Sequence, residues 1–171
     1  MLRKATGAAL LLLPLTVLPA IAVDRKAFLI GFAVGGGTLD CFGCHSSGAG
    51  SVAVHLGGSI SKKATLAAEF FQVIHAESFE TRYSSQTTVF LQYWVLSRLW
   101  VGGGPGYGNS SIQFGNVTVS EPQAFAVALQ VGVEVWQRGR FALVLRGRYG
   151  RIFTDPEATS HIVALAGFTW Y

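Results

Sequence analysis

The sequence has little charge, little sulfur and little proline. Only 13% of its 171 residues are Asp, Glu, Lys or Arg, and it holds two cysteines, one methionine and five prolines. With half of the residues hydrophobic, this composition excludes a disordered tail and a coiled coil, and two cysteines exclude a scaffold held by several disulfides. Only one apolar run approaches the length of a membrane-spanning helix, and it lies at the N-terminus, which excludes a helical bundle in the membrane.

Basic residues are also too few and too scattered for a nucleic-acid partner. The formal net charge is +4, but Arg3 and Lys4 lie in a segment that we expect to be removed, which leaves +2. The one remaining group of basic residues is Arg146, Arg148 and Arg151. We therefore expect no nucleic-acid partner.

Residues 1–22 have the features of a secretory signal peptide: a basic start, an apolar centre and the small-x-small sequence Ala-Ile-Ala at residues 20–22. A retained membrane anchor is the alternative, although Pro14 and Pro19 interrupt the apolar run, which is also short for a span. We predict an exported domain of residues 23–171 in an oxidising compartment.

In the exported part, apolar and polar residues alternate with a period of two, which predicts strands rather than helices. Each segment has about 10 to 14 residues, close to the roughly 9 to 11 that a tilted strand needs to cross a bilayer. The eight predicted strands are residues 26–38, 50–61, 64–76, 83–95, 98–108, 123–136, 140–152 and 160–171.

The connections between these strands alternate between short and long. The short ones are residues 61–64, 96–98 and 137–140, and the long ones are residues 39–49, 76–82, 109–122 and 154–160. This alternation is typical of an up-and-down outer-membrane barrel, with short periplasmic turns and longer external loops. The predicted fold is an all-β, eight-stranded antiparallel transmembrane barrel with both ends in the periplasm.

Each predicted strand has one apolar face and one face of small or polar residues. In the strand at residues 123–136 the apolar face is Phe125, Val127, Leu129, Val131, Val133 and Val135, opposed by Ala126, Ala128, Gln130, Gly132 and Glu134. A soluble barrel would turn the apolar face inward. The low charged fraction and an inner face that reads as small and polar rather than bulky favour lipid outside. Aromatic residues near the end of the last strand, Phe168, Trp170 and Tyr171, favour an assembly signal for outer-membrane insertion.

The sequence resembles the small bacterial outer-membrane β-barrel proteins, within the eight-stranded group of outer membrane proteins X and W. The segments that carry the resemblance are LIGFAVGGGTLDCFGC, VHLGGSISKKATLAAE, LWVGGGPGYG, ALQVGVEVWQRGRFALVLRGRYG and LAGFTWY. The resemblance implies a Gram-negative outer-membrane location, with membrane lipid and the assembly machinery as partners. It implies no established activity, and His45 departs from the pattern.

Cys41, Cys44 and His45 match the CxxCH motif that attaches c-type haem. His55, His75 or His161 could supply a sixth ligand. An eight-stranded interior has room only for its own side chains, however, and the motif lies in a predicted external loop. We predict a Cys41–Cys44 disulfide and no cofactor, with haem c as the alternative.

Four charged residues fall on the predicted inner face: Glu69, Glu134, Arg146 and Arg148. We predict a lumenal ion-pair network, because unpaired charges in a barrel core are costly. A proton or ion path is the alternative. The glycine run at residues 102–106 lacks the Lys-Ser/Thr of a phosphate loop, and we expect it to relieve crowding where the strands curve.

Ser160 beside His161 matches no known catalytic motif, so we predict no catalytic residues and no enzymatic activity. The predicted function is structural or surface-interacting, with an unknown external ligand and no channel for general solutes. The alternatives are a narrow, porin-like transporter of small hydrophobic molecules and a haem-bearing barrel.

Overall fold

The computed structural model describes residues 28–41, 44–77, 79–154 and 158–171, and the predicted signal peptide lies outside these ranges. The strands are β1 (Phe28–Cys41), β2 (Cys44–Ser61), β3 (Ala64–Ala76), β4 (Thr81–Trp94), β5 (Leu99–Phe114), β6 (Val117–Ser120), β7 (Ala124–Arg138), β8 (Phe141–Ile152) and β9 (Thr159–Trp170). Among the described residues, no helix has the length and apolarity needed to cross a membrane.

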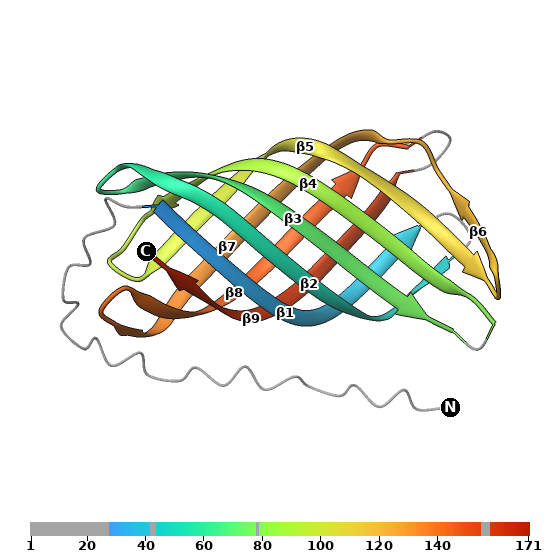
Figure 1. Ribbon diagram of the computed structural model, residues 1–171, viewed down its shortest axis with the longest axis horizontal. Coiled ribbons are helices and arrows are strands. Elements are labelled where there is room, and N and C mark those ends of the chain that lie inside the picture. Colours follow the sequence, from blue (N-terminus) through green and yellow to red (C-terminus); the bar gives the residue numbers. More distant parts are fainter. Residues whose placement is uncertain (1–27, 42–43, 78, 155–157) are drawn as a thin grey trace, which may run out of the picture.

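Eight of these strands form a closed antiparallel barrel, in which the strands run obliquely around one axis (Figure 1). β1 closes the barrel by pairing with β9, in a continuous register from Ile30 opposite Trp170 to Asp40 opposite Ser160. The short β6 pairs only with the far end of β5, so β5 and β7 are neighbours in the wall. The predicted fold is therefore confirmed.

The two ends of the barrel differ in their connections. Three tight turns join β2 to β3, β4 to β5 and β7 to β8 at the end where the last strand finishes (Figure 1). Gly139 in the last of these turns has a φ of +59°, which a glycine adopts without strain. Short turns mark the periplasmic side of such barrels, so we call this the periplasmic end and the opposite one the outer end.

At the outer end, two of the predicted loops are strand extensions. β1 continues to Cys41 and β2 begins at Cys44, so most of residues 39–49 form a hairpin. Within residues 109–122, β5 continues to Phe114 and pairs there with β6. The prediction of loops was wrong because glycine, serine and asparagine are turn signals, yet a two-stranded ladder satisfies the backbone groups of such residues equally well.

The predicted facing of the strands is confirmed. Along β7, Leu129 and Val131 are 60% and 48% exposed, whereas Gln130 between them is buried. The same alternation runs through β8 and β3. The exposed wall includes Phe32, Val54, Phe70, Leu91, Val101, Leu145 and Ile162. Such a wall suits lipid and not water.

The inner face is bulkier than the sequence pattern suggested. Buried aromatic side chains fill the lumen, among them Phe71, Phe90, Trp94, Trp100 and Tyr171. The expectation of a small and polar interior was therefore wrong: small residues alternate with large ones, as a filled barrel requires.

Glycines on β5 allow its backbone to lie close to the backbone of β4. A Cβ built on Gly104 would lie 2.8 Å from the Cα of Phe90 on β4. The glycine run thus allows the two strands to approach closely.

Candidate functional site: a charged cluster in the lumen

Glu69 on β3 is the centre of a charged cluster that crosses the lumen. Its carboxylate accepts hydrogen bonds from Arg146 Nη1 at 2.6 Å and from Arg148 Nε at 3.0 Å. Gln130 Nε2 donates to the same carboxylate at 2.7 Å, and Arg146 Nη1 also donates to Gln130 Oε1 at 3.2 Å. The three charged side chains are almost completely buried. The structure thus brings together three of the four predicted lumenal charges.

Side chains of three further residues contact Arg148 from different sides. Its Nη2 donates to Gln86 Oε1 at 2.8 Å, and its Nη1 contacts His161 Nε2. The guanidinium carbon lies 3.8 Å from the ring centre of Phe71, and that ring stacks on His161 with 4.8 Å between centres. These contacts combine ion pairing with a cation–π interaction. The cluster therefore ties β3, β4, β8 and β9 together across the lumen.

This cluster has one carboxylate for two guanidinium groups. A buried charge is costly unless hydrogen bonds and opposite charge surround it. The amide oxygens of Gln86 and Gln130 and the face of Phe71 supply the additional acceptors. Glu69 is the member on which the others depend, because both arginines donate to it.

Two apolar layers lie on either side of the charged cluster. The layer toward the periplasmic end consists of Leu29, Ala67, Phe90, Trp94, Trp100, Ala142, Val144 and Tyr171. The layer toward the outer end consists of Ala33, Leu39, Ala49, Ala53, Phe71, Val73, Val163 and Leu165. A polar solute would have to pass both layers and the ion pairs between them.

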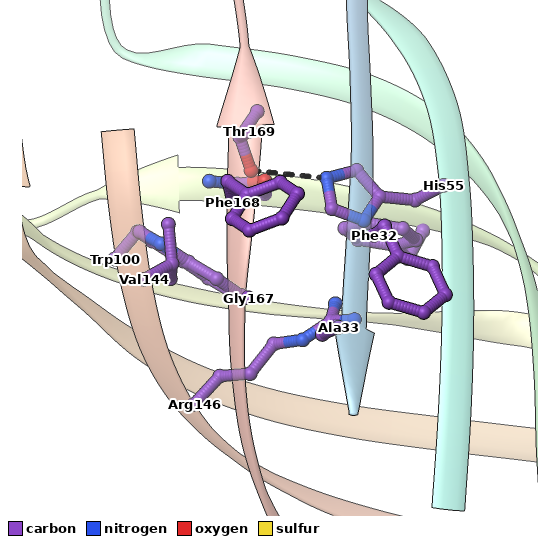
Figure 2. A pocket seen from close by; sticks show the side chains of 11 residues that line it. Phe32, Ala33, His55, Trp100, Val144, Arg146, Gly167, Phe168 and Thr169 are labelled. Carbon is purple, nitrogen blue, oxygen red and sulfur yellow. Dashed lines mark hydrogen bonds between the residues drawn. The ribbon is translucent and has the colours of Figure 1, made fainter. Parts of the chain in front are cut away.

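A small cavity remains beside the cluster, with a volume of about 10 Å³. Figure 2 shows His55 bonded to Thr169, with Arg146 and Trp100 approaching from other strands; the His55 Nε2–Thr169 Oγ1 distance is 3.3 Å. Among the described residues, His55 Nδ1, Trp100 Nε1 and Arg146 Nη2 have no hydrogen-bond partner. A cavity of this size and polarity fits about one water molecule, which is far from a continuous channel.

The fourth predicted lumenal charge, Glu134, binds a different group. Its Oε1 accepts a hydrogen bond of 2.6 Å from the hydroxyl of Tyr171. Both side chains are buried near the periplasmic end, where Tyr171 also packs beside Trp94. This contact holds the last residue inside the barrel mouth.

The three residues of the predicted assembly signal have different surroundings. Phe168 is 59% exposed on the lipid-facing wall, Trp170 is half-buried beneath Arg140, and Tyr171 points into the lumen. Their role in assembly stays a prediction.

The CxxCH motif lies at the tip of the β1–β2 hairpin. The backbones of Cys41 and Cys44 are paired in the ladder, while residues 42–43 and the side chain of His45 lie outside the described part. The disulfide and the haem alternative therefore both stay predictions.

The three histidines considered as haem ligands have partners of their own. His161 contacts Arg148, His55 contacts Thr169, and His75 contacts the Gly48 carbonyl at 2.8 Å and Glu77 at 3.0 Å. His161 is therefore a lumenal residue of the cluster, beside the half-buried Ser160. The absence of enzymatic activity stays a prediction.

Sequence reasoning did not identify Gln86, Gln130 and His161 as members of the cluster. All three occupy inward positions of their strands, so alternation places them in the lumen but not in this cluster. Their contacts with Glu69 and the two arginines depend on the stagger between the strands, which alternation does not reveal.

No protein-family model and no curated protein matches the sequence. Several solved structures match the fold. Neisserial surface protein A (NspA) has a TM-score of 0.69 at 15% identity, covering 84% of this chain and 96% of NspA. Ail, the attachment invasion locus protein of Yersinia pestis, solved with the heparin analogue sucrose octasulfate, has a TM-score of 0.61 at 12% identity, covering 84% of this chain and 97% of Ail.

The outer membrane protein OprG of Pseudomonas aeruginosa has a TM-score of 0.52 at 12% identity, covering 88% of this chain and 98% of OprG. The chain has the fold of the small outer-membrane barrels. At these identities the similarity extends to architecture and not to ligands.

Proposed function

We propose that the protein is an integral barrel of the bacterial outer membrane that acts through its outer end and passes no polar solute through its lumen. The side chains that fill the lumen are the observation that carries this proposal. Glu69, Arg146 and Arg148 fill its middle, and an apolar layer closes it on each side. An eight-stranded barrel has little interior space beyond that of its own side chains.

The apolar wall supports the membrane part of the proposal. Large apolar side chains are exposed on every strand of the wall, and burying them in lipid removes them from water. Outer-membrane lipid is therefore the first partner. The assembly machinery is a second partner, which would read the C-terminal aromatic residues before the barrel closes.

The outer end supports a role in surface interaction. The β5–β6 hairpin carries the exposed residues Val117 and Val119, and Phe79 in the β3–β4 turn is 90% exposed. Acidic residues outnumber basic ones on the described part of this end: Asp40, Glu77, Glu80 and Glu121 against Arg82 and Arg151. This charge favours a partner with basic and apolar groups, in contrast to the sulfated ligand named for Ail.

Conductance of the refolded protein in planar bilayers tests the sealed lumen. We expect no current steps under conditions in which a large porin, run as a positive control, gives them. Regular steps from the wild-type protein would overturn the proposal.

The transport alternative needs a separate test, because hydrophobic molecules carry no current. Uptake of an apolar dye into vesicles should be the same with and without the protein. Faster uptake with the protein would favour the alternative of a narrow hydrophobic transporter.

The surface role is tested by shortening the β5–β6 hairpin. Replacing residues 110–122 by Asn-Gly, a sequence that forms a two-residue hairpin turn, continues the register that pairs Gly108 with Ala124 and should leave insertion unchanged. Binding of fluorescent polylysine to the outer end should fall, because Glu121 and the exposed hairpin are lost. Equal polylysine binding by the two forms would contradict a role for this hairpin.

A further inference from the structure

The lipid-facing wall has an open groove near the periplasmic end, across β7, β8 and β9. It has a volume of about 780 Å³ and is lined by Trp136, Arg138, Phe141, Ala142, Leu143 and Phe168. In the strand register Trp136 lies opposite Leu143, which lies opposite Phe168. The groove is therefore an apolar row across three adjacent strands, with one arginine at its end.

A β-bulge creates this groove. The β7–β8 register shifts between Glu134 and Trp136, and as a result Val135 and Trp136 are both exposed, at 42% and 52%. In a regular strand these neighbours would face opposite sides. The bulge thus turns Trp136 outward, where its ring forms one side of the groove.

Positive charge lies at the periplasmic end of the groove and continues along the periplasmic rim of the barrel. Arg138 and Arg140 flank Gly139 in the β7–β8 turn, and both are exposed. The guanidinium carbon of Arg140 lies 5.9 Å from the ring centre of Trp170. The other two periplasmic turns contribute Lys62, Lys63 and Arg98, and none of the three turns holds an acidic residue.

From this arrangement we propose that the groove binds an anionic phospholipid of the inner leaflet, with an acyl chain along Trp136, Leu143 and Phe168 and the phosphate at Arg138 and Arg140. Charge complementarity argues for this occupant: the apolar part of the groove ends at the headgroup level, where two arginines meet a phosphate. Arginine side chains commonly extend along apolar surface toward the headgroups in this way. The inference rests on the membrane location in the proposed function.

Brominated phospholipids test the site, because bromine on an acyl chain quenches the fluorescence of a tryptophan that it touches. The purified chain is refolded into phosphatidylcholine vesicles that contain brominated phosphatidylglycerol or, at an equal fraction, brominated phosphatidylcholine. Subtracting the signal of Trp136→Phe isolates Trp136. We expect brominated phosphatidylglycerol to occupy the position next to Trp136 at least fivefold more strongly, because one arginine near an anionic headgroup gives about this factor and the site has two.

Double substitutions at two pairs of residues distinguish a specific lipid site from a general electrostatic attraction of anionic lipid to the periplasmic end. Arg138→Gln with Arg140→Gln should reduce the preference to about one, whereas Arg138→Lys with Arg140→Lys should retain most of it. Lys62→Gln with Lys63→Gln removes the same charge from the same end, but from a turn distant from the groove in strand order, and should leave the preference unchanged.

Two results would overturn the proposed lipid site: no preference in the wild-type protein, or an equal loss in the glutamine variants of both pairs. Failure of every brominated lipid to quench Trp136 would instead contradict the membrane location itself, so the two proposals fail in different ways. Heat-modifiable gel mobility checks that each variant is folded.

Discussion

The two faces of the barrel wall are built from the same strands and have opposite chemistry. On β8, Arg146 and Arg148 point into the lumen, while Leu145 between them is 46% exposed on the wall. On β7, Gln130 contributes to the charged cluster and the adjacent Val131 faces outward. One residue of displacement along a strand therefore decides whether a charge has partners or faces lipid.

This difference shows what the barrel tolerates and where. In the lumen each arginine of the cluster has Glu69 within hydrogen-bond distance, and amide and aromatic groups complete the shell. Outside, no such partners exist in the hydrocarbon region, so a charge there has only lipid around it. Substitutions on one face at a time therefore test this difference.

Removal of the central carboxylate should have the largest effect. Glu69→Leu leaves Arg146 and Arg148 buried without an opposite charge, and we expect a loss of about 3 to 5 kcal/mol in the free energy of unfolding. The loss is measured by urea unfolding of the protein refolded in vesicles. Glu80→Gln is the matched control, because Glu80 pairs with Arg82 at 2.6 Å at the more accessible outer end. Its expected loss is about 1 kcal/mol or less. Equal losses would show that the lumenal cluster contributes no more to the free energy of unfolding than the ion pair at the outer end.

A charge on the lipid-facing wall should have the next largest effect. Val131→Arg places a cation near the middle of the bilayer, at an expected cost of about 2 to 4 kcal/mol. Gln130→Glu places a carboxyl group one residue away on the lumenal face. It keeps an acceptor for Arg146 and, by holding a proton, can still donate to Glu69 as the amide does, so it should cost much less. Folding efficiency into vesicles and unfolding free energies compare the two. If both variants fold equally well and have the same unfolding free energy, our assignment of the two faces of β7 is wrong.

Loss of the hydroxyl at the periplasmic mouth should have a smaller effect. Tyr171→Phe removes the hydrogen bond to the buried Glu134 carboxylate, and we expect a loss of about 1 to 3 kcal/mol. Tyr93→Phe on the lipid-facing side of β4 serves as the control and should change stability by about 0.5 kcal/mol or less. A loss no larger for Tyr171→Phe than for Tyr93→Phe would mean that this contact does not hold the C-terminus.

Replacement of the two cysteines should have the smallest effect on the barrel. Cys41→Ser with Cys44→Ser removes a predicted four-residue ring whose contribution is no more than about 2 kcal/mol on the chain-entropy model. Assembly should remain intact, because the pair lies at the tip of the β1–β2 hairpin. Mass spectrometry of the wild-type protein should show the loss of two hydrogen atoms. A haem-sized gain in mass with a Soret absorption band would instead establish the haem alternative.

Much of the fold could be predicted from the sequence, because a barrel wall repeats one simple rule. Alternation along residues 123–136 is enough to identify a strand and its two faces. The same rule, applied to β4, places Phe90 and Trp94 inward, so the aromatic layer follows from the sequence. The polar residues Thr88 and Gln92 on the same face are what made the interior look polar. The short β6 was missed because Gly115 and Asn116 have the composition of a turn within a loop.

The geometry of the charged cluster could not be predicted in the same way. Glu69 and Arg148 are 79 positions apart in sequence, and whether they lie at the same level depends on the stagger summed over the strands between them. Alternation assigned both to the lumen, but it could not separate their cluster from the Glu134–Tyr171 contact nearer the periplasmic end.

A scan of spin labels along β7 tests the two-faced wall most directly. Single cysteines at positions 124 to 136, in the Cys41→Ser, Cys44→Ser background, are labelled, and their collision rates with oxygen in the bilayer are measured. We predict high rates at Phe125, Leu129 and Val131 and low rates at Ala128 and Gln130, with the alternation broken at the bulge so that Val135 and Trp136 are both accessible. An inverted pattern, or rates without a period of two, would contradict a barrel with its apolar face in lipid and its charges sealed inside.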